Sequence, residues 1–181
     1  MTDGIAIDIT IREDVTAAIG RLVAAGGDLS PVMGDIAGHL ADTTRERFET
    51  STDPDGVPWK PSRRVLGLDG SREGHGPFQL SGKTLVLSGD LMNSIVENWG
   101  KDFAEAGPEK SGGAGVYARI HQEGGTITPK NGKALSFGGR MLASVTIPAR
   151  RYLGFNDTNA DYVVGAIGDH LVASFAEVPA A

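Results

Sequence analysis

Alternating apolar and polar positions open the chain. Isoleucines stand at every second position from Ile5 to Ile11, separated by Ala6, Asp8 and Thr10. A period of two residues puts one set of side chains on one face of an extended segment. The pattern therefore predicts a strand over residues 5–11 with one buried face.

Three stretches carry apolar residues at helical spacing. The first, 14–25, is followed by two glycines, which commonly end a helix. The second starts at Ser30, a good N-cap before Pro31, and reaches about Phe48. The third starts near Asp157, which can cap it. The apolar stripes are Val15, Ile19, Leu22 and Val23; Val32, Ile36, Leu40 and Phe48; and Val163, Ile167, Leu171 and Phe175.

The segment of about 51–85 has neither period. Four prolines and six glycines interrupt it, so it predicts a long irregular loop after the second helix. A structureless connection of this length is uncommon in a compact domain, and we expect it to become ordered against a partner. The Trp59 ring is its expected anchor.

Short patterns follow the loop. They predict helices over 88–94 and 116–122, and strands over 95–99, 103–106, 126–128, 135–137 and 145–147. The expected fold class is α+β, with an antiparallel or mixed sheet packed against helices. The length suits a single domain over residues 1–181.

Composition narrows the function. The 181 residues include no cysteine, which excludes disulfides and thiolate zinc sites and suits assembly in a reducing host cytoplasm. The formal net charge of -6 disfavours nonspecific binding to nucleic acid. No basic residue precedes the first apolar positions and no apolar stretch approaches the roughly 20 residues of a membrane span, so we expect neither secretion nor membrane insertion.

Two motif-like segments fail as ligand sites. Leu80-Ser81-Gly82-Lys83-Thr84 resembles the end of a phosphate-binding loop, but Pro77 stands where the first glycine is needed. Asp53-Pro54-Asp55-Gly56 has the start of a calcium loop, but Arg64 occupies the position of its last ligand, a glutamate. A tight surface turn explains the second segment better. We expect no cofactor.

The histidines and arginines leave alternatives open. The four histidines are dispersed, which argues against a zinc site, and His121 is expected to bond within the fold rather than act as a base with Glu123. Lys60, Arg63 and Arg64 form one basic group, and Arg150-Arg151 after Pro148 forms another. Each is either a solvated face or a set of contacts to carboxylates of a partner.

Four segments remain, at 53–59, 85–95, 117–125 and 147–154. They are an acidic turn ending in tryptophan, a Leu-Ser-Gly-Asp-Leu stretch, Tyr-Ala-Arg-Ile-His-Gln, and Pro-Ala-Arg before the last helix. Together and in this order they resemble the phage virion morphogenesis family, which includes tail completion proteins of Mu-like and other contractile-tailed phages. Glu123, in place of an aromatic residue, and Arg151-Tyr152, in place of proline and an aromatic residue, depart from its pattern. The candidate family-motif or interface residues are Trp59, Tyr117, His121, Gln122, Pro148, Arg150, Arg151, Leu153 and Gly154.

The resemblance implies a structural protein, not an enzyme, that acts in tail completion and head-tail joining. A tail terminator at the head-proximal end of the tail is the expected role, with a neck adaptor or connector subunit as the alternative. The implied partners are further copies in a homo-oligomeric ring, six by family analogy, the tail tube protein and head-tail connector proteins, with DNA at most passing through the channel. The implied location is the virion neck or head-proximal tail end.

Two other classes stay open as runners-up. A small phage hydrolase would need His121 and a carboxylate as acid and base. A nucleic-acid-binding accessory protein would use Arg63, Arg64, Arg150 and Arg151, against the net charge of the chain.

Overall fold

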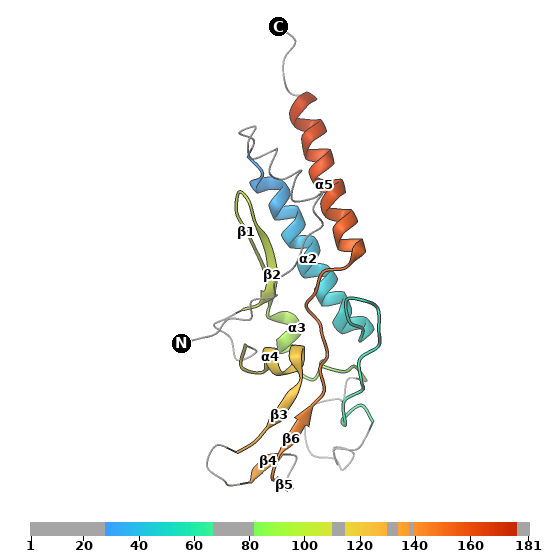
Figure 1. The fold of residues 1–181 in the computed structure, drawn as a ribbon, viewed down its shortest axis with the longest axis vertical. Helices are drawn as coiled ribbons and strands as arrows, with labels where there is room; N and C mark the ends of the chain where they lie inside the picture. The colour runs from blue at the N-terminus through green and yellow to red at the C-terminus, as the bar shows by residue number, and fades with distance from the viewer. Residues whose placement is uncertain (1–27, 67–81, 110–114, 130–133, 138–139, 177–181) are drawn as a thin grey trace. The chain divides into compact units, whose positions relative to one another are not determined.

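A computed structural model describes residues 28–66, 82–109, 115–129, 134–137 and 140–176 (Figure 1). Helices and short antiparallel strands make up these residues, so the α+β class is confirmed. The strand predicted at 5–11 and the helix predicted at 14–25 lie outside the described residues. In the described part of the chain, no helix combines the length and apolarity needed to cross a membrane.

The described residues divide between two compact units. The helical unit contains 28–44, 95–107 and 154–176, and the motif unit contains 45–66, 82–94, 108–109, 115–129, 134–137 and 140–153. Helix α2, Ser30–Thr50, contributes residues to both. The single domain over 1–181 stays a prediction.

The core of the helical unit lies between α2 and α5, Asp157–Ala176. It joins buried residues of both apolar stripes, which confirms the predicted periodicity of the two helices. Leu40 and Leu171 pack against this cluster. The buried members are Leu29, Val32, Met33, Ile36, Val163 and Ile167.

Both helices begin at the residue that was expected to cap them, so a preceding residue takes the capping role. The Ser30 backbone nitrogen donates to the Asp28 carboxylate at 3.0 Å, so Ser30 is already inside the helix. At α5, the Asn159 nitrogen donates to the Asn156 side chain at 2.9 Å, and the Asn156 nitrogen donates back to the Asn159 side chain at 3.3 Å. This reciprocal pair satisfies two backbone donors that a helix start leaves unpaired, so Asn156 takes the capping role expected of Asp157.

Strands β1, Ile95–Trp99, and β2, Ala104–Pro108, form a two-stranded sheet. The turn between them is closed by the Gly100 nitrogen, which donates to the Phe103 carbonyl at 3.0 Å. The Trp99 ring lies over Gly34 of α2, where an added Cβ would meet the indole nitrogen at 3.2 Å. A glycine at that position lets the hairpin pack closely on the helix.

The motif unit contains two short helices and a β ribbon. The helices are α3, Asp90–Asn93, and α4, Gly115–Glu123, close to the predicted ranges 88–94 and 116–122. The β ribbon, residues 125–147, pairs β3 (Gly125–Ile127) with β6 (Val145–Ile147), and β4 (Leu135–Phe137) with β5 (Arg140–Leu142), both antiparallel. Strand β5 was not predicted, because a three-residue strand next to Gly138-Gly139 has too few positions to show a period.

The predicted loop is tied at both ends in the described residues. Ser51 adopts a left-handed conformation, φ 57°, which ends α2. Arg64 donates to the carbonyls of Lys83 and Val86 at 2.7 and 3.2 Å, which joins the two ends of the loop. Beyond an isolated bridge between Thr52 and Pro58, the described loop residues form no strand or helix. Ordering of the loop against a partner stays a prediction.

Candidate functional site

The acidic turn at 53–59 is built around one carboxylate. A single oxygen of Asp53 accepts the backbone nitrogens of Asp55 and Val57, each at 2.9 Å. The Asp53 nitrogen donates to the Val57 carbonyl at 2.9 Å, and Gly56 turns the chain with φ 78°. Aspartate and glycine are therefore required here by local backbone bonding, as the sequence indicated.

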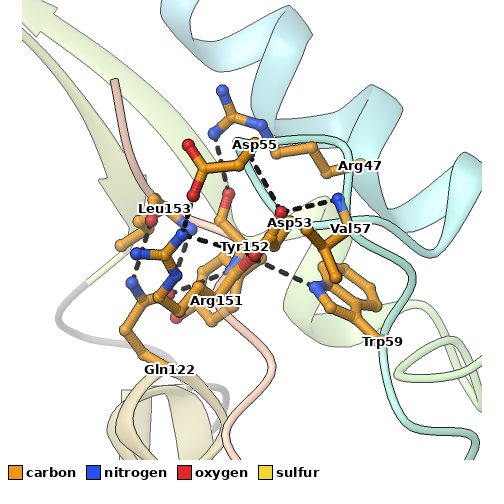
Figure 2. A network of polar contacts seen from close by, with 9 residues as sticks. All are labelled: Arg47, Asp53, Asp55, Val57, Trp59, Gln122, Arg151, Tyr152 and Leu153. Atoms are coloured by element: carbon orange, nitrogen blue, oxygen red, sulfur yellow. Dashed lines mark hydrogen bonds and ion pairs between the residues drawn. The ribbon is translucent and has the colours of Figure 1, made fainter. Parts of the chain in front are cut away.

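This turn delivers Trp59 to a buried aromatic cluster. The Trp59 side chain is 6% exposed and meets the Phe48 ring edge-on, with centroids 5.6 Å apart. Phe48 in turn packs on Tyr152 at 5.2 Å. The indole nitrogen of Trp59 donates to the Arg151 carbonyl at 3.1 Å, so its polar edge is satisfied as its ring is buried (Figure 2). Trp59 is an anchor of the loop within the chain itself.

Gln122 holds the backbone of residues 147–154, the fourth of the motif segments. Its side-chain oxygen accepts from the nitrogens of Tyr152 and Leu153, each at 3.0 Å, and its side-chain nitrogen donates to the Leu153 carbonyl at 2.9 Å (Figure 2). The Gln122 amide thereby pairs with an extended segment as a neighbouring strand would. Because these groups are buried, each bond also satisfies a group that would otherwise be costly.

Arg47, near the end of α2, completes the support of this segment. Its guanidinium donates to the Tyr152 carbonyl at 3.0 Å from a buried position. Burial lowers the pKa of Arg47, and the nearby Asp53 and Asp55 carboxylates oppose that shift. No sequence pattern singled out Arg47 as a site residue. The missed contact joins residues too far apart in the chain for any spacing rule.

The two arginines of the pair have different environments. Arg150 is 6% exposed and donates to the Lys60 carbonyl at 2.8 Å, and burial lowers its pKa. The Arg151 side chain is 51% exposed and forms ion pairs with Asp55 and, at 3.3 Å, with Asp53 (Figure 2). Its hydrogen bond to Asp55 raises the pKa of Arg151. Both arginines therefore have partners inside the chain, which the sequence had not distinguished from partners in another protein.

His121 does not form the acid–base pair that a hydrolase would need. Its Nδ1 atom is buried and has no hydrogen-bond partner among the described residues. Burial, with a smaller contribution from Arg150, lowers the pKa of His121. The Glu123 carboxylate instead accepts from Arg119 at 3.0 Å. The side-chain hydrogen bond expected of His121 is not made at Nδ1, and it is the backbone carbonyl of His121 that accepts from the Arg150 nitrogen at 2.7 Å.

Gly124 ends α4 against the fourth motif segment. It has φ 73°, and a Cβ there would lie 2.6 Å from the Ala149 nitrogen. No other residue type fits this close approach without a shift of backbone.

Tyr117 lies one turn before His121 on α4. Its ring packs edge-on against the His121 ring, with centroids 6.0 Å apart.

The structure thus gathers most of the sequence-predicted residues into one cluster of the motif unit. Trp59, Gln122, Arg150 and Leu153 are buried there, Pro148 is half-buried, and Gly154 belongs to the helical unit. Within the described residues, no group of three or more metal-ligating side chains is found. The hydrogen bonds of this cluster join segments of the same chain that lie far apart in the sequence.

Comparison of the sequence with known proteins identifies the family of this chain. The chain belongs to the phage virion morphogenesis family, whose model matches residues 11–172, and it therefore takes part in building a phage particle. It is 30% identical over 176 residues to the putative capsid assembly protein G of Escherichia phage Mu, covering 92% of this chain and 98% of that protein. It is also 30% identical over 149 residues to the Mu-like prophage FluMu G protein 2 of Haemophilus influenzae. That match covers 82% of this chain and 83% of that protein. No solved structure matches the chain.

Proposed function

We propose that this protein completes the phage tail as a terminator at the head-proximal end of the tail tube. It is a non-enzymatic subunit of a closed ring, six copies by family analogy, between the tail tube protein and the head-tail connector proteins. Family membership over residues 11–172 is the observation that carries the proposal. A ring follows because a tube end presents rotationally symmetric surfaces, which identical head-to-tail contacts can match.

The motif cluster supports a structural role over an enzymatic one. Gln122, Trp59 and Arg150 use their polar atoms to hold backbone groups of the same chain. Among the described residues no carboxylate bonds to the buried Nδ1 atom of His121, and Glu123 pairs with Arg119. A general base must lie within hydrogen-bond reach of the proton it removes, and a half-buried ring without a described partner acid does not offer that arrangement.

The net charge supports a ring around passing DNA. With 23 acidic and 17 basic residues, the chain has a formal net charge of -6, which repels phosphates overall. A channel that lets DNA through should not hold phosphates tightly. We place the protein in the virion neck or at the head-proximal tail end for this reason, after assembly in the host cytoplasm.

A neck adaptor or connector subunit is the second candidate. The relative from phage Mu carries the name of a putative capsid assembly protein, which favours a position on the head side of the joint.

Tail length distinguishes the two candidates. A tube without its cap has an open end that continues to polymerise, whereas a tube without an adaptor stops at its normal length. Phage that lack this protein should therefore form overlong, unjoined tails in electron micrographs, and purified protein added to normal-length tails should restore joining. Normal-length tails beside full heads would favour the adaptor, and infectious particles without the protein would overturn both.

A further inference from the structure

The loop base, residues 60–66 and 82–87, is a basic surface of the motif unit. Arg64 joins its two segments by donating to the carbonyls of Lys83 and Val86. The loop base includes no acidic residue and four basic ones, Lys60, Arg63, Arg64 and Lys83. Lys83 forms an ion pair with Glu49 of α2, so the loop base has a formal charge of +3 when this carboxylate is counted with it.

Apolar side chains are exposed on both segments of the loop base. Leu66 lies on the first segment and Leu87 on the second, and they are 54% and 53% exposed. Lys60 and Arg63 are exposed as well. Because arginine and large apolar residues are the types that protein interfaces bury, the loop base is suited to a protein partner of opposite charge.

The β1–β2 hairpin of the helical unit has that opposite charge. Its residues 95–107 hold one basic residue, Lys101, and three exposed acidic residues, Glu97, Asp102 and Glu105, so its formal charge is -2. The hairpin also exposes aromatic side chains, since Trp99 and Phe103 are 48% and 45% exposed. Its surface is therefore apolar and acidic, whereas that of the loop base is apolar and basic.

The hairpin presents these side chains on a defined backbone. Gly100 closes its turn by donating to the Phe103 carbonyl, and the Asn98 side chain donates to the Glu105 carboxylate at 2.8 Å across the two strands. In the described sheet, β1 and β2 pair only with each other. A hairpin with exposed aromatic and acidic side chains can thus bind a partner without being ordered first.

We propose that the β1–β2 hairpin of one copy binds the loop base of the next copy and so forms the head-to-tail contact of the ring. This inference rests on the proposed function, because a closed ring needs two different complementary surfaces on each subunit. Opposite charge and exposed apolar side chains on both surfaces provide that complement. A second copy fits the loop base better than DNA, because Arg64 and Lys83 already bond within the chain and two exposed leucines offer nothing to a phosphate backbone.

Cysteine cross-linking in assembled particles tests the contact directly, because the chain has no cysteine of its own. Asp102→Cys or Phe103→Cys is combined with Leu66→Cys or Leu87→Cys, and the particles are oxidised. A disulfide forms only where Cα atoms come within about 7 Å. At least one pair should give a ladder of covalent multiples, whereas Val172→Cys with Leu87→Cys should not, since Val172 is exposed outside both surfaces.

The single cysteine variants are the matched control. Each should stay monomeric on oxidation, because a head-to-tail contact joins two different positions and keeps identical ones apart. Dimers of a single variant, or a disulfide that closes within one chain, would contradict the contact. Joined, infectious particles with no ladder from any pair would overturn it and leave the proposed function standing.

Competition for places in the particle gives an independent measure. The variant Lys60→Glu/Arg63→Glu, produced beside an equal amount of wild type, should enter particles at least tenfold less often than Asp161→Lys/Asp169→Lys. The second variant reverses as many exposed charges outside both surfaces. Circular dichroism checks that both variants are folded. Equal incorporation of the two would contradict the inference.

Exchange of the charges should restore the contact. Lys60→Glu/Arg63→Glu combined with Asp102→Lys/Glu105→Lys, produced alone, should again give joined particles, because every contact then pairs reversed charges. No recovery by this folded fourfold variant would overturn the pairing of these two surfaces. Retention of duplex DNA by the wild type, lost in Lys60→Glu/Arg63→Glu, would assign the loop base to nucleic acid instead.

Discussion

Gln122 holds Tyr152 through a backbone bond rather than a side-chain contact: its side-chain oxygen accepts from the Tyr152 nitrogen at 3.0 Å. The same oxygen accepts from the next residue, Leu153. One amide thus fixes the backbone on which the Phe48 and Trp59 rings depend for their position.

Gln122→Leu should lower the free energy of unfolding by about 3 kcal/mol. The leucine has a similar size but leaves buried backbone groups of Tyr152 and Leu153 without partners, at about 1–3 kcal/mol each. Urea unfolding measures the loss, with the exposed Glu123→Gln as the control. A change below about 0.5 kcal/mol, the range of ordinary surface substitutions, would show that water replaces the amide at no cost.

Arg150→Glu and Arg151→Glu should differ strongly in stability. Arg150 is buried, so an acidic side chain there faces the Lys60 carbonyl and should cost about 3 kcal/mol or more. Arg151 is exposed, and the loss of its ion pairs together with the repulsion of the new carboxylate by Asp53 and Asp55 should cost about 2 kcal/mol or less. Equal midpoints of urea unfolding for the two variants would refute the difference. For assembly tests, Arg151 is therefore the member of the pair that can be reversed in a folded protein.

Gly124→Ala should destabilise the protein by at least about 2 kcal/mol. The residue has φ 73°, and the new Cβ would lie 2.6 Å from the Ala149 nitrogen, so strain adds to a clash with backbone. Gly107→Ala is the matched control, because nothing lies within 4 Å of its added Cβ. Thermal unfolding of both variants checks the prediction, and similar melting temperatures would count against it.

His121 should make the stability depend on pH below about 6.5, the ordinary histidine pKa. Burial lowers its pKa in the folded state, so the unfolded state binds its proton first. The contribution is complete above the unfolded pKa and is lost as the pH falls toward the folded pKa. His121→Phe should lose less stability than the wild type between pH 7.5 and 5.5. Parallel stability curves for both proteins would exclude the buried imidazole as the cause.

Amide hydrogen exchange should distinguish protected from unprotected amides within the predicted loop. The amides of Asp53, Val57 and Trp59 are bonded within the turn or to Ser51, so they should be protected in the free subunit. Exposed Lys60 serves as the comparison on the same segment. Its carbonyl accepts from Arg150, but its amide nitrogen has no partner among the described residues. Exchange of Trp59 as fast as Lys60 would show that the turn forms only in the particle.

The elements that sequence predicted well are those with a local cause. The stripe of α2 and α5, the bounds of β1, β4 and β6, and the acidic turn all follow from periods or turn residues within a few positions. The caps differ from the prediction because each expected capping residue has another residue of capping type shortly before it, Asp28 two positions before Ser30 and Asn156 one position before Asp157.

The site was predictable in its members but not in its contacts. The sequence singled out Trp59, Gln122 and Arg150. It did not indicate their partners, because these are backbone groups more than 30 positions away, where no spacing rule applies. Arg47 and Phe48 were missed as site residues because each also satisfies an ordinary helix pattern.

The motif cluster also sets when the chain can finish folding. Its contacts join Arg47 to Tyr152, Asp53 to Arg151 and Trp59 to Arg151, across 105, 98 and 92 positions. Contacts of such long range are slow to form, because the loop between them must close before they contribute any energy. During synthesis the cluster cannot form until Leu153 has been made, 94 residues after Trp59. The apolar faces of Phe48 and Trp59 are thus exposed on the nascent chain until the segment that ends in Leu153 has been made, and the subunit is prone to aggregate if synthesis of that segment is delayed.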